Sequence, residues 1–181
     1  MATLVLLTGL PATGKSTLAG RAADALGAPV LGHDWAMAGL RPFGGLQAVL
    51  DNMDRVEARG VGWSVVWSMA RAQLRDGRSV VLDGVARDTE VEATRSLAGE
   101  EGVRCLVVLT SCDDSDVHRD RVEGRRRAIP HWYELTWEQV ARSRAGWVPP
   151  ADVDLVLPAE GRLGENVERL LDLLSTAEGP G

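Results

Sequence analysis

Lysine is almost absent from this sequence. Lys15 is the only lysine among 20 basic residues, and Phe and Tyr occur once each beside six Trp. The single lysine is therefore not a by-product of a lysine-rich surface, and its position needs an explanation of its own.

Other absences narrow the class of protein. Cys105 and Cys112 have neither the spacing of metal ligands nor the density of a disulfide framework, which suits a reducing cytoplasm. No apolar run reaches the ~20 residues of a membrane span, and residues 1–8 lead straight into a glycine-rich loop, so we expect neither membrane anchor nor signal peptide. A net charge of −6 argues against a general binder of polyanions. We therefore expect a cytoplasmic protein.

The single lysine lies in the stretch around which the rest of the chain is organised. Residues 3–8 are an apolar run that predicts a buried strand, and Gly9-Leu-Pro-Ala-Thr-Gly-Lys-Ser-Thr17 follows it. This matches G-x-x-x-x-G-K-[ST], the phosphate-binding loop, and leads into a predicted helix that ends at Gly27. Lys15 would reach the β- and γ-phosphates of a nucleotide, and the Ser16 hydroxyl would bind Mg²⁺. The residues that we assign to ATP here are Gly9, Pro11, Ala12, Thr13, Gly14, Lys15, Ser16 and Thr17.

Apolar strands alternate with amphipathic helices along the rest of the chain. We predict strands at 28–32, 79–83, 103–110 and 152–157, and helices over 46–56, 65–74, 88–97, 113–127, 136–144 and 167–174, with a mobile loop at 39–45. This alternation predicts an α/β protein with the three-layer P-loop NTPase fold, a five-stranded parallel sheet with helices on both faces. We expect one domain over residues 1–177, with a helical lid at about 113–148, and a disordered tail at 178–181.

Two aspartates follow predicted strands, at the sheet edge where ligands bind in this class of fold. Asp34 could orient or deprotonate an attacking hydroxyl, or cap the next helical turn; we favour catalysis, with a structural role for its neighbour His33. Asp83 ends the central strand and could hold a Mg²⁺-bound water, contact the acceptor or cap a helix. Arg87, four residues later, could reach the same pocket or remain solvated.

The densest basic cluster comprises Arg119, Arg121, Arg125, Arg126 and Arg127. Acidic residues are interspersed with it, so some of these arginines should form only surface ion pairs. Arg121 and Arg125 are four residues apart and would share one face of the predicted helix. Because guanidinium groups suit both base stacking and the clamping of a phosphoryl group, we assign Arg121 and Arg125 to the nucleotide and Arg125 also to catalysis.

The six tryptophans are predicted to divide between site and core. Trp35 adjoins Asp34 and is predicted to line the acceptor site, while packing in the core explains Trp63 and Trp67 more simply. Trp132, Trp137 and Trp147 lie around the predicted lid, where they either cover the site or pack its helices.

With the loop, Asp34, Ser79-Val-Val-Leu-Asp-Gly84 and Arg121-Val-Glu-Gly-Arg125 in place, the chain resembles small P-loop kinases with an AAA-type ATP-binding domain. The group that it resembles contains the kinase domains of polynucleotide kinases, zeta toxins and chloramphenicol phosphotransferase-like enzymes. The resemblance implies that Asp34 is the general base and that lid arginines, including Arg127 as a further candidate, contact the nucleotide.

Two departures from that group leave the acceptor undefined. Asp83-Gly-Val-Ala-Arg87 lacks the Thr-Asn pair of the family's Asp-Ala-Thr-Asn run. The arginine that polynucleotide kinases tend to carry soon after the base is represented here only by Arg41, beyond an insertion.

Three functions fit these residues. The first is an ATP- and Mg²⁺-dependent phosphotransferase acting on a hydroxyl of a small molecule, with Trp35, Arg41, Asp83 and Arg87 beside Asp34 at the acceptor. The second is a 5′-hydroxyl kinase of RNA or DNA, which would need a basic groove near Arg41 and Arg87. The third is an ATP-binding regulatory protein that transfers nothing. The sequence names neither the acceptor nor the oligomeric state.

Overall fold

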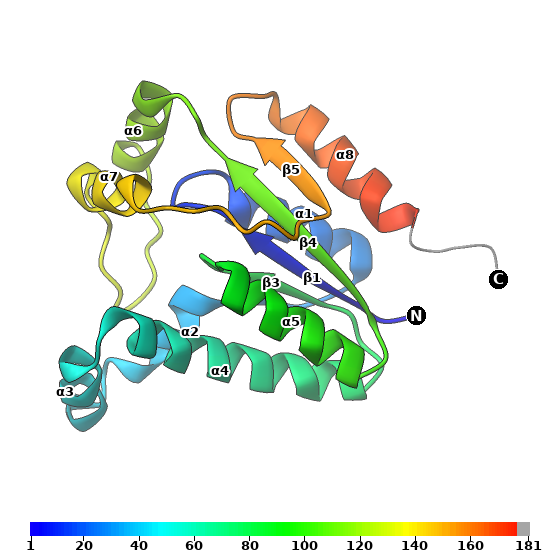
Figure 1. Cartoon of the computed structure of the whole chain (residues 1–181), viewed down its shortest axis with the longest axis horizontal. Helices are drawn as coiled ribbons and strands as arrows, with labels where there is room; N and C mark the ends of the chain where they lie inside the picture. Colours follow the sequence, from blue (N-terminus) through cyan, green and yellow to red (C-terminus); the bar gives the residue numbers. More distant parts are fainter. Residues whose placement is uncertain (177–181) are drawn as a thin grey trace.

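The computed structural model describes residues 1–176, and its centre is a parallel sheet (Figure 1). The strands run in the order β2-β3-β1-β4-β5, and every neighbouring pair is parallel. Their bounds are β1 Thr3–Thr8, β2 Val30–Gly32, β3 Val80–Asp83, β4 Arg104–Ser111 and β5 Leu155–Pro158. The prediction of a five-stranded parallel α/β sheet is confirmed.

The middle strand of the sheet is β1, whereas the strand at 79–83 that was predicted to be central is its neighbour β3. β1 is buried on both faces, because its side chains alternate between two separate cores. Leu4 and Leu6 pack with residues of α4 and α5, whereas Val5 and Leu7 pack with residues of α1 and α8. All four side chains have no exposed surface. Helices therefore cover both faces of the sheet, as Figure 1 shows.

Eight helices occur in residues 1–176. Their bounds are α1 Lys15–Leu26, α2 His33–Leu40, α3 Gly44–Asn52, α4 Arg55–Arg75, α5 Asp88–Glu100, α6 Ser115–Glu123, α7 Trp137–Ala145 and α8 Leu163–Ser175. None of those described is both long and apolar enough to cross a membrane. α2, α3, α6 and α7 gather at the end of the molecule toward which the strands point (Figure 1).

The region between β2 and β3 differs from the prediction. The expected mobile loop at 39–45 is a short turn, because α2 continues to Leu40 and α3 begins at Gly44. The single helix predicted over 46–56 is divided between α3 and α4. It breaks at Asp54, whose carboxylate accepts hydrogen bonds from the backbone N–H groups of Val56 and Glu57 and so starts a new helix.

The helix predicted over 113–127 is also shorter than expected. Asp114 caps its start, and α6 ends at Glu123 because Gly124 follows. Arg125, Arg126 and Arg127 consequently lie in an irregular segment between α6 and α7. The predicted tail at 178–181 lies outside the described residues.

Candidate functional site

The phosphate-loop sequence adopts a conformation that two glycines make accessible. Gly9 has φ +135°, and a Cβ there would lie 2.1 Å from the carbonyl oxygen of Thr110 on β4. Gly14 has φ +96° and immediately precedes α1. Side chains other than hydrogen are strained at both positions. The loop is thereby packed against β4 and delivers Lys15 and Ser16 to the first turn of α1.

Threonine hydroxyls hold this loop in place. The Thr13 hydroxyl donates to the Leu10 carbonyl at 2.7 Å and lies 2.6 Å from the Thr110 hydroxyl. The Thr8 hydroxyl donates to the carbonyl of Ala86 and accepts from its backbone N–H, at 2.9 and 2.8 Å. Both ends of the loop are therefore tied to neighbouring elements of the sheet.

Lys15 is buried, and its ammonium group donates to the Leu10 carbonyl at 2.7 Å. No carboxylate in residues 1–176 lies within 4.0 Å of it. Burial lowers the pKa of Lys15 to about 8, although the negative charge of Asp83 acts in the opposite direction. Negative charge placed beside this ammonium would stabilise its protonated form.

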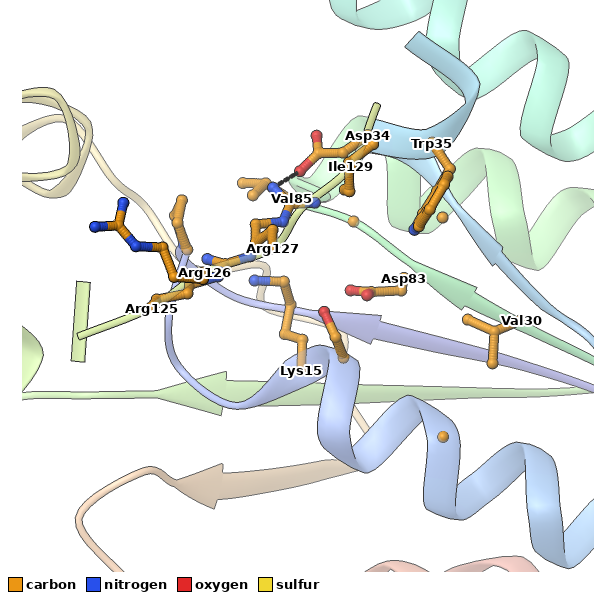
Figure 2. Close-up of a pocket in the computed structure, with 15 residues that line it drawn as sticks. Lys15, Val30, Asp34, Trp35, Asp83, Val85, Arg125, Arg126, Arg127 and Ile129 are labelled. Carbon is orange, nitrogen blue, oxygen red and sulfur yellow. Dashed lines mark hydrogen bonds and ion pairs between the residues drawn. The ribbon is translucent and has the colours of Figure 1, made fainter. Parts of the chain in front are cut away.

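Asp34 lies in the first turn of α2, directly after β2. Its carboxylate accepts a hydrogen bond from the Arg127 guanidinium, and its other oxygen lies 3.6 Å from the Nδ1 atom of His33 (Figure 2). Burial acts to raise the pKa of Asp34, but His33 and Arg127 outweigh it and lower that pKa to about 2. Asp34 is therefore held as a carboxylate by two partners.

His33 has contacts that fit the structural role expected for it. Its Nε2 atom lies 3.0 Å from the carbonyl oxygen of Arg59 on α4, and its ring packs 5.3 Å from that of Trp63. The backbone of α4 lies very close to the His33 ring, since a Cβ added at Gly62 would be only 2.5 Å from the same Nε2 atom. The imidazole thus fixes the start of α2 against α4.

Lys15, Asp34 and Asp83 line one cavity of about 440 Å³. Asp83 lies at the carboxyl end of β3, where it pairs in register with Leu7 of β1. The side chains of Lys15 and Asp83 point into this space in Figure 2. The full lining is Pro11, Lys15, Ser16, Gly20, Val30, Gly32, Asp34, Trp35, Asp83, Gly84, Val85, Arg125, Arg126, Arg127 and Ile129.

Trp35 gives this cavity an exposed aromatic wall. The residue is 59% exposed, although it lies beside Asp34 at the start of α2. Trp63 is instead fully buried in the core, and Trp67 donates its ring N–H to Thr94 at 3.0 Å. Of these three tryptophans, Trp35 is the one that reaches the cavity.

The arginine cluster reaches the site through an irregular segment. Arg125, Arg126 and Arg127 line the main cavity, and Arg125 also lines a neighbouring cavity of about 230 Å³ with Arg121. The predicted basis for this convergence, one face of a helix, is wrong because α6 ends at Glu123. Burial, together with Arg127, lowers the pKa of Arg125, so an anion here would relieve a buried excess of positive charge.

Three other arginines lie outside this cavity: Arg119 of the basic cluster, and Arg41 and Arg87, which were predicted at the acceptor. Arg119 stacks on Trp137, with 5.3 Å between guanidinium carbon and ring centre. Arg41 stacks on the paired rings of Trp132 and Tyr133, at 4.9 and 5.1 Å. Arg87 lies 5.7 Å over the ring of Trp147 and lines a different cavity. The expectation that Arg41 and Arg87 share the pocket of Asp34 is not met, because aromatic rings hold both outside it.

Ser16 and Asp83 were the predicted metal residues, and both line the main cavity. Within residues 1–176 there is no group of three or more His, Cys, Asp or Glu side chains that could enclose a metal ion. These two residues suit a Mg²⁺ ion that takes its remaining ligands from phosphate oxygens and water.

The comparison with protein families agrees with this geometry. Residues 4–150 match the family AAA_33, described as an AAA domain. The chain belongs to this AAA domain family. The match begins in β1, includes the phosphate loop, and ends after α7, so it covers every residue of the main cavity.

One sequence relative of this AAA domain is much longer. The uncharacterized protein Rv2004c of Mycobacterium tuberculosis is 30% identical over 166 residues, which cover 90% of this chain and 33% of that protein. The chain thus spans about a third of the length of the curated relatives that it matches.

Solved kinase structures share the fold of this AAA domain. A putative kinase from Chloroflexus aurantiacus has a TM-score of 0.69 at 18% identity, covering 97% of this chain and 98% of its own. A gluconokinase from Sinorhizobium meliloti has a TM-score of 0.68 at 17% identity, covering 97% and 94%. The Mycobacterium tuberculosis APS kinase CysC, in complex with AMPPNP and APS, has a TM-score of 0.66 at 22% identity, covering 96% and 98%.

Several residues that shape the site of this AAA domain were not predicted from the sequence. Thr8 and Thr110 each follow the apolar middle of a strand, a position that could have marked them as polar anchors. His118 contacts the Pro11 carbonyl, and Arg144 contacts His118. The sequence around these last two carries no signal beyond an ordinary polar helix.

Proposed function

We propose that this protein is an ATP-dependent phosphotransferase whose acceptor is a hydroxyl group of a small molecule. The observation that carries the proposal is the convergence of Lys15, Asp34 and Asp83 on one cavity at the carboxyl edge of the sheet, beside the phosphate loop. Membership of the AAA domain family and the fold shared with small-molecule kinases support the same function.

In this proposal the phosphate loop and Lys15 bind the β- and γ-phosphates of ATP, and Arg121 and Arg125 approach them from the other side. Mg²⁺, held by the phosphates with Ser16 and Asp83, would offset the charge of the transferring group. The low pKa of Lys15 supports this assignment, because a phosphate would supply the negative charge that its buried ammonium lacks.

The acceptor hydroxyl is placed between Asp34 and the γ-phosphate. Its oxygen forms a bond to the γ-phosphorus while the bond from that phosphorus to the β–γ bridging oxygen breaks, and ADP leaves. The hydroxyl proton passes to the Asp34 carboxylate. Because Asp34 is paired with Arg127 and has a low pKa, we expect it chiefly to orient the hydroxyl and to accept the proton late.

We further propose that residues 113–148 act as a lid. This segment supplies Arg121, Arg125 and Arg127 to the two cavities. Its irregular part between α6 and α7 contacts α2 through the ion pair of Arg127 with Asp34. Closure over the nucleotide would exclude water and so suppress hydrolysis of ATP.

The test is transfer of labelled phosphate from ATP with Mg²⁺ to a pool of small hydroxyl compounds. We expect wild-type protein to label one class of compound, and Asp34→Asn to lose about 10²–10⁴-fold in turnover. Asp24→Asn, which changes an exposed aspartate on α1, is the matched control and should retain activity. Equal transfer by wild type and Asp34→Asn would exclude the proposed role of Asp34, and nucleotide binding without transfer to any acceptor would favour a regulatory protein.

A further inference from the structure

A second large cavity adjoins the proposed active site. It has a volume of about 490 Å³ and shares Pro11 and Val85 with the main cavity. Four separate parts of the chain form it: the phosphate loop, the N-terminal end of α4, the segment after β3, and the C-terminal end of α7 with the residues that follow. Its lining is Leu10, Pro11, Arg55, Val56, Arg59, Val85, Arg87, Arg142, Ser143, Gly146 and Trp147.

The charge of this cavity is opposite to that of the whole chain. The protein has a net charge of −6, with 26 acidic and 20 basic residues. Four arginines, Arg55, Arg59, Arg87 and Arg142, nevertheless line the cavity, and its lining includes no Asp or Glu. Four like charges around one space repel each other, so an anion bound among them would compensate this charge and be stabilised by it.

The carboxylates of the fold supply little of that compensation. Arg59 is paired with Glu90, at 2.9 Å. For Arg55, Arg87 and Arg142, no carboxylate in residues 1–176 lies within 4.0 Å of the guanidinium nitrogens. Three of the four guanidinium groups therefore keep donors free for a ligand.

The positions of two of these arginines favour a bound anion. Arg55 is the first residue of the 21-residue helix α4, where the helix dipole is unfavourable for a cation. The guanidinium of Arg87 lies over the ring of Trp147, 5.7 Å from its centre, which restricts its orientation. The charge of Arg55, which the dipole of α4 disfavours, would be stabilised by a bound anion. The guanidinium of Arg87 is already oriented by Trp147, as expected for a preformed anion site.

We propose that this cavity binds an anionic group of the acceptor, a phosphate, sulfate or carboxylate. The inference rests on the proposed function, because the shared wall of Pro11 and Val85 would let one small molecule span both cavities. Its hydroxyl would lie at Asp34 and its anionic group among Arg55, Arg87 and Arg142. The substrate class is thus a hydroxyl compound that already carries a negative charge.

Direct binding tests the cavity without relying on phosphate transfer. The phosphate loop is first saturated with AMPPNP and Mg²⁺, and inorganic phosphate is then titrated by calorimetry. We expect binding to wild-type protein and a loss of about tenfold in affinity for Arg55→Gln and for Arg87→Gln. Arg162→Gln is the matched control, because the Arg162 side chain is 89% exposed and lies far along the chain, before α8. Equal phosphate affinity in all four proteins would overturn the proposal.

Failure of the proposed function would be recognised separately. If AMPPNP does not bind, the assignment of the phosphate loop fails, and the phosphate titration of the same variants without nucleotide still decides the role of the cavity. If AMPPNP binds but phosphate affinity does not depend on Arg55 or Arg87, the cavity proposal alone fails.

Activity provides the second arm of the test. Hydroxyl compounds are compared in pairs that differ only by a phosphate, sulfate or carboxylate group. We expect wild-type protein to prefer the charged member, and Arg87→Gln to raise the KM for it by about tenfold while the KM for ATP is unchanged. Equal use of both members would overturn the proposal. So would transfer to a single-stranded 5′-hydroxyl oligonucleotide alone, with an affinity that falls steeply with salt, since that would make the cavity part of a nucleic-acid groove.

Discussion

Asp34 is connected to the rest of the cavity through Arg127, which reaches it from a segment 93 residues further along the chain. The pair has two consequences for a reaction at Asp34. It keeps the carboxylate ionised, and it occupies one of the two carboxylate oxygens. A substrate or nucleotide phosphate that attracts Arg127 would release that oxygen and raise the proton affinity of Asp34.

Replacement of Arg127 should reveal this coupling in the pKa of Asp34. In Arg127→Gln we expect that pKa to rise from about 2 toward the ordinary value of about 4. A carboxyl ¹³C titration by NMR, with the Asp34 signal assigned by its loss in Asp34→Asn, measures the change. Arg126→Gln is the control, since Arg126 lines the same cavity but lies within 4.0 Å of no carboxylate in residues 1–176.

The same variant should change the pH dependence of stability. The pKa of Asp34 in the folded protein lies below the unfolded value, so its ion pair stabilises the fold above about pH 4 and the contribution disappears as the pH falls toward 2. Because the Asp34 side chain is 34% exposed, solvent screening limits the effect to about 1 kcal/mol at pH 7. Urea unfolding of wild type and Arg127→Gln should therefore converge near pH 2. A constant difference across the range would contradict the assignment.

Among the elements, α6 and α7 are joined to the phosphate loop by a buried histidine. The Nε2 atom of His118, on α6, lies 2.7 Å from the Pro11 carbonyl, and Arg144, on α7, lies 3.2 Å from its Nδ1 atom. Arginine can only donate, so Nδ1 accepts and Nε2–H donates to Pro11. Burial lowers the pKa of His118, with Arg144 adding to the effect, although the bond to Pro11 acts against it. The neutral imidazole thus positions the loop.

Removal of this contact should weaken nucleotide binding without touching a catalytic group. His118→Phe leaves the Pro11 carbonyl without its donor, so we expect the Kd of AMPPNP to rise about tenfold and the free energy of unfolding to fall by about 1–3 kcal/mol. His118→Gln retains an amide donor and should recover much of both. His131→Gln, which alters an exposed histidine, is the control.

The pH dependence separates this role from simple packing. Because the folded protein keeps His118 neutral, the wild type should lose stability as the pH falls below the ordinary histidine pKa of about 6.5. That loss should be smaller in His118→Gln. Urea unfolding at pH 8 and pH 5.5 measures this loss of stability. An equal change in the free energy of unfolding between the two pH values for wild type and variant would exclude a neutral, hydrogen-bonded His118.

The elements that sequence patterns predicted well are those that the sheet defines. Apolar runs predicted the five strands, and glycine or aspartate marked the ends of the first three. Gly27 predicted the end of α1. The break between α3 and α4 was hidden, because the apolar spacing continues through Asp54 while its side chain begins a new helix. Gly124 was overlooked for a related reason, since polar residues continue past it without a change of pattern.

At the scale of the whole molecule, the residues of the main cavity that could be predicted are those that lie at or near the ends of strands. Asp83 is the last residue of an apolar strand, and Asp34 and Lys15 each lie a few residues after one, so parallel order alone brings all three to one edge. Arg127 lies in an irregular segment that gives no direction, so its pairing with Asp34 could not be derived from spacing. The same holds for the four-arginine cavity, whose members come from α4, α7 and the segment after β3.

That irregular segment offers a test of whether the molecule closes around nucleotide. Trypsin cleaves after lysine and arginine, and the only lysine in the chain, Lys15, is buried. Almost all cleavage should therefore occur after arginines. Arg126 is exposed and lies outside any helix, and it should be an early site. If Arg125 binds phosphate and the 113–148 segment acts as a lid, AMPPNP with Mg²⁺ should slow cleavage after Arg126 by about tenfold.

Arg162 provides the internal control for this experiment, because its side chain is 89% exposed and it takes no part in the proposed lid. Cleavage after Arg162 should proceed at the same rate with and without nucleotide, and mass spectrometry of the fragments separates the two sites. Slower cleavage at both would indicate general stabilisation by the ligand. Unchanged cleavage after Arg126, while calorimetry shows AMPPNP bound, would mean that the segment does not close and that Arg125 reaches the nucleotide without moving.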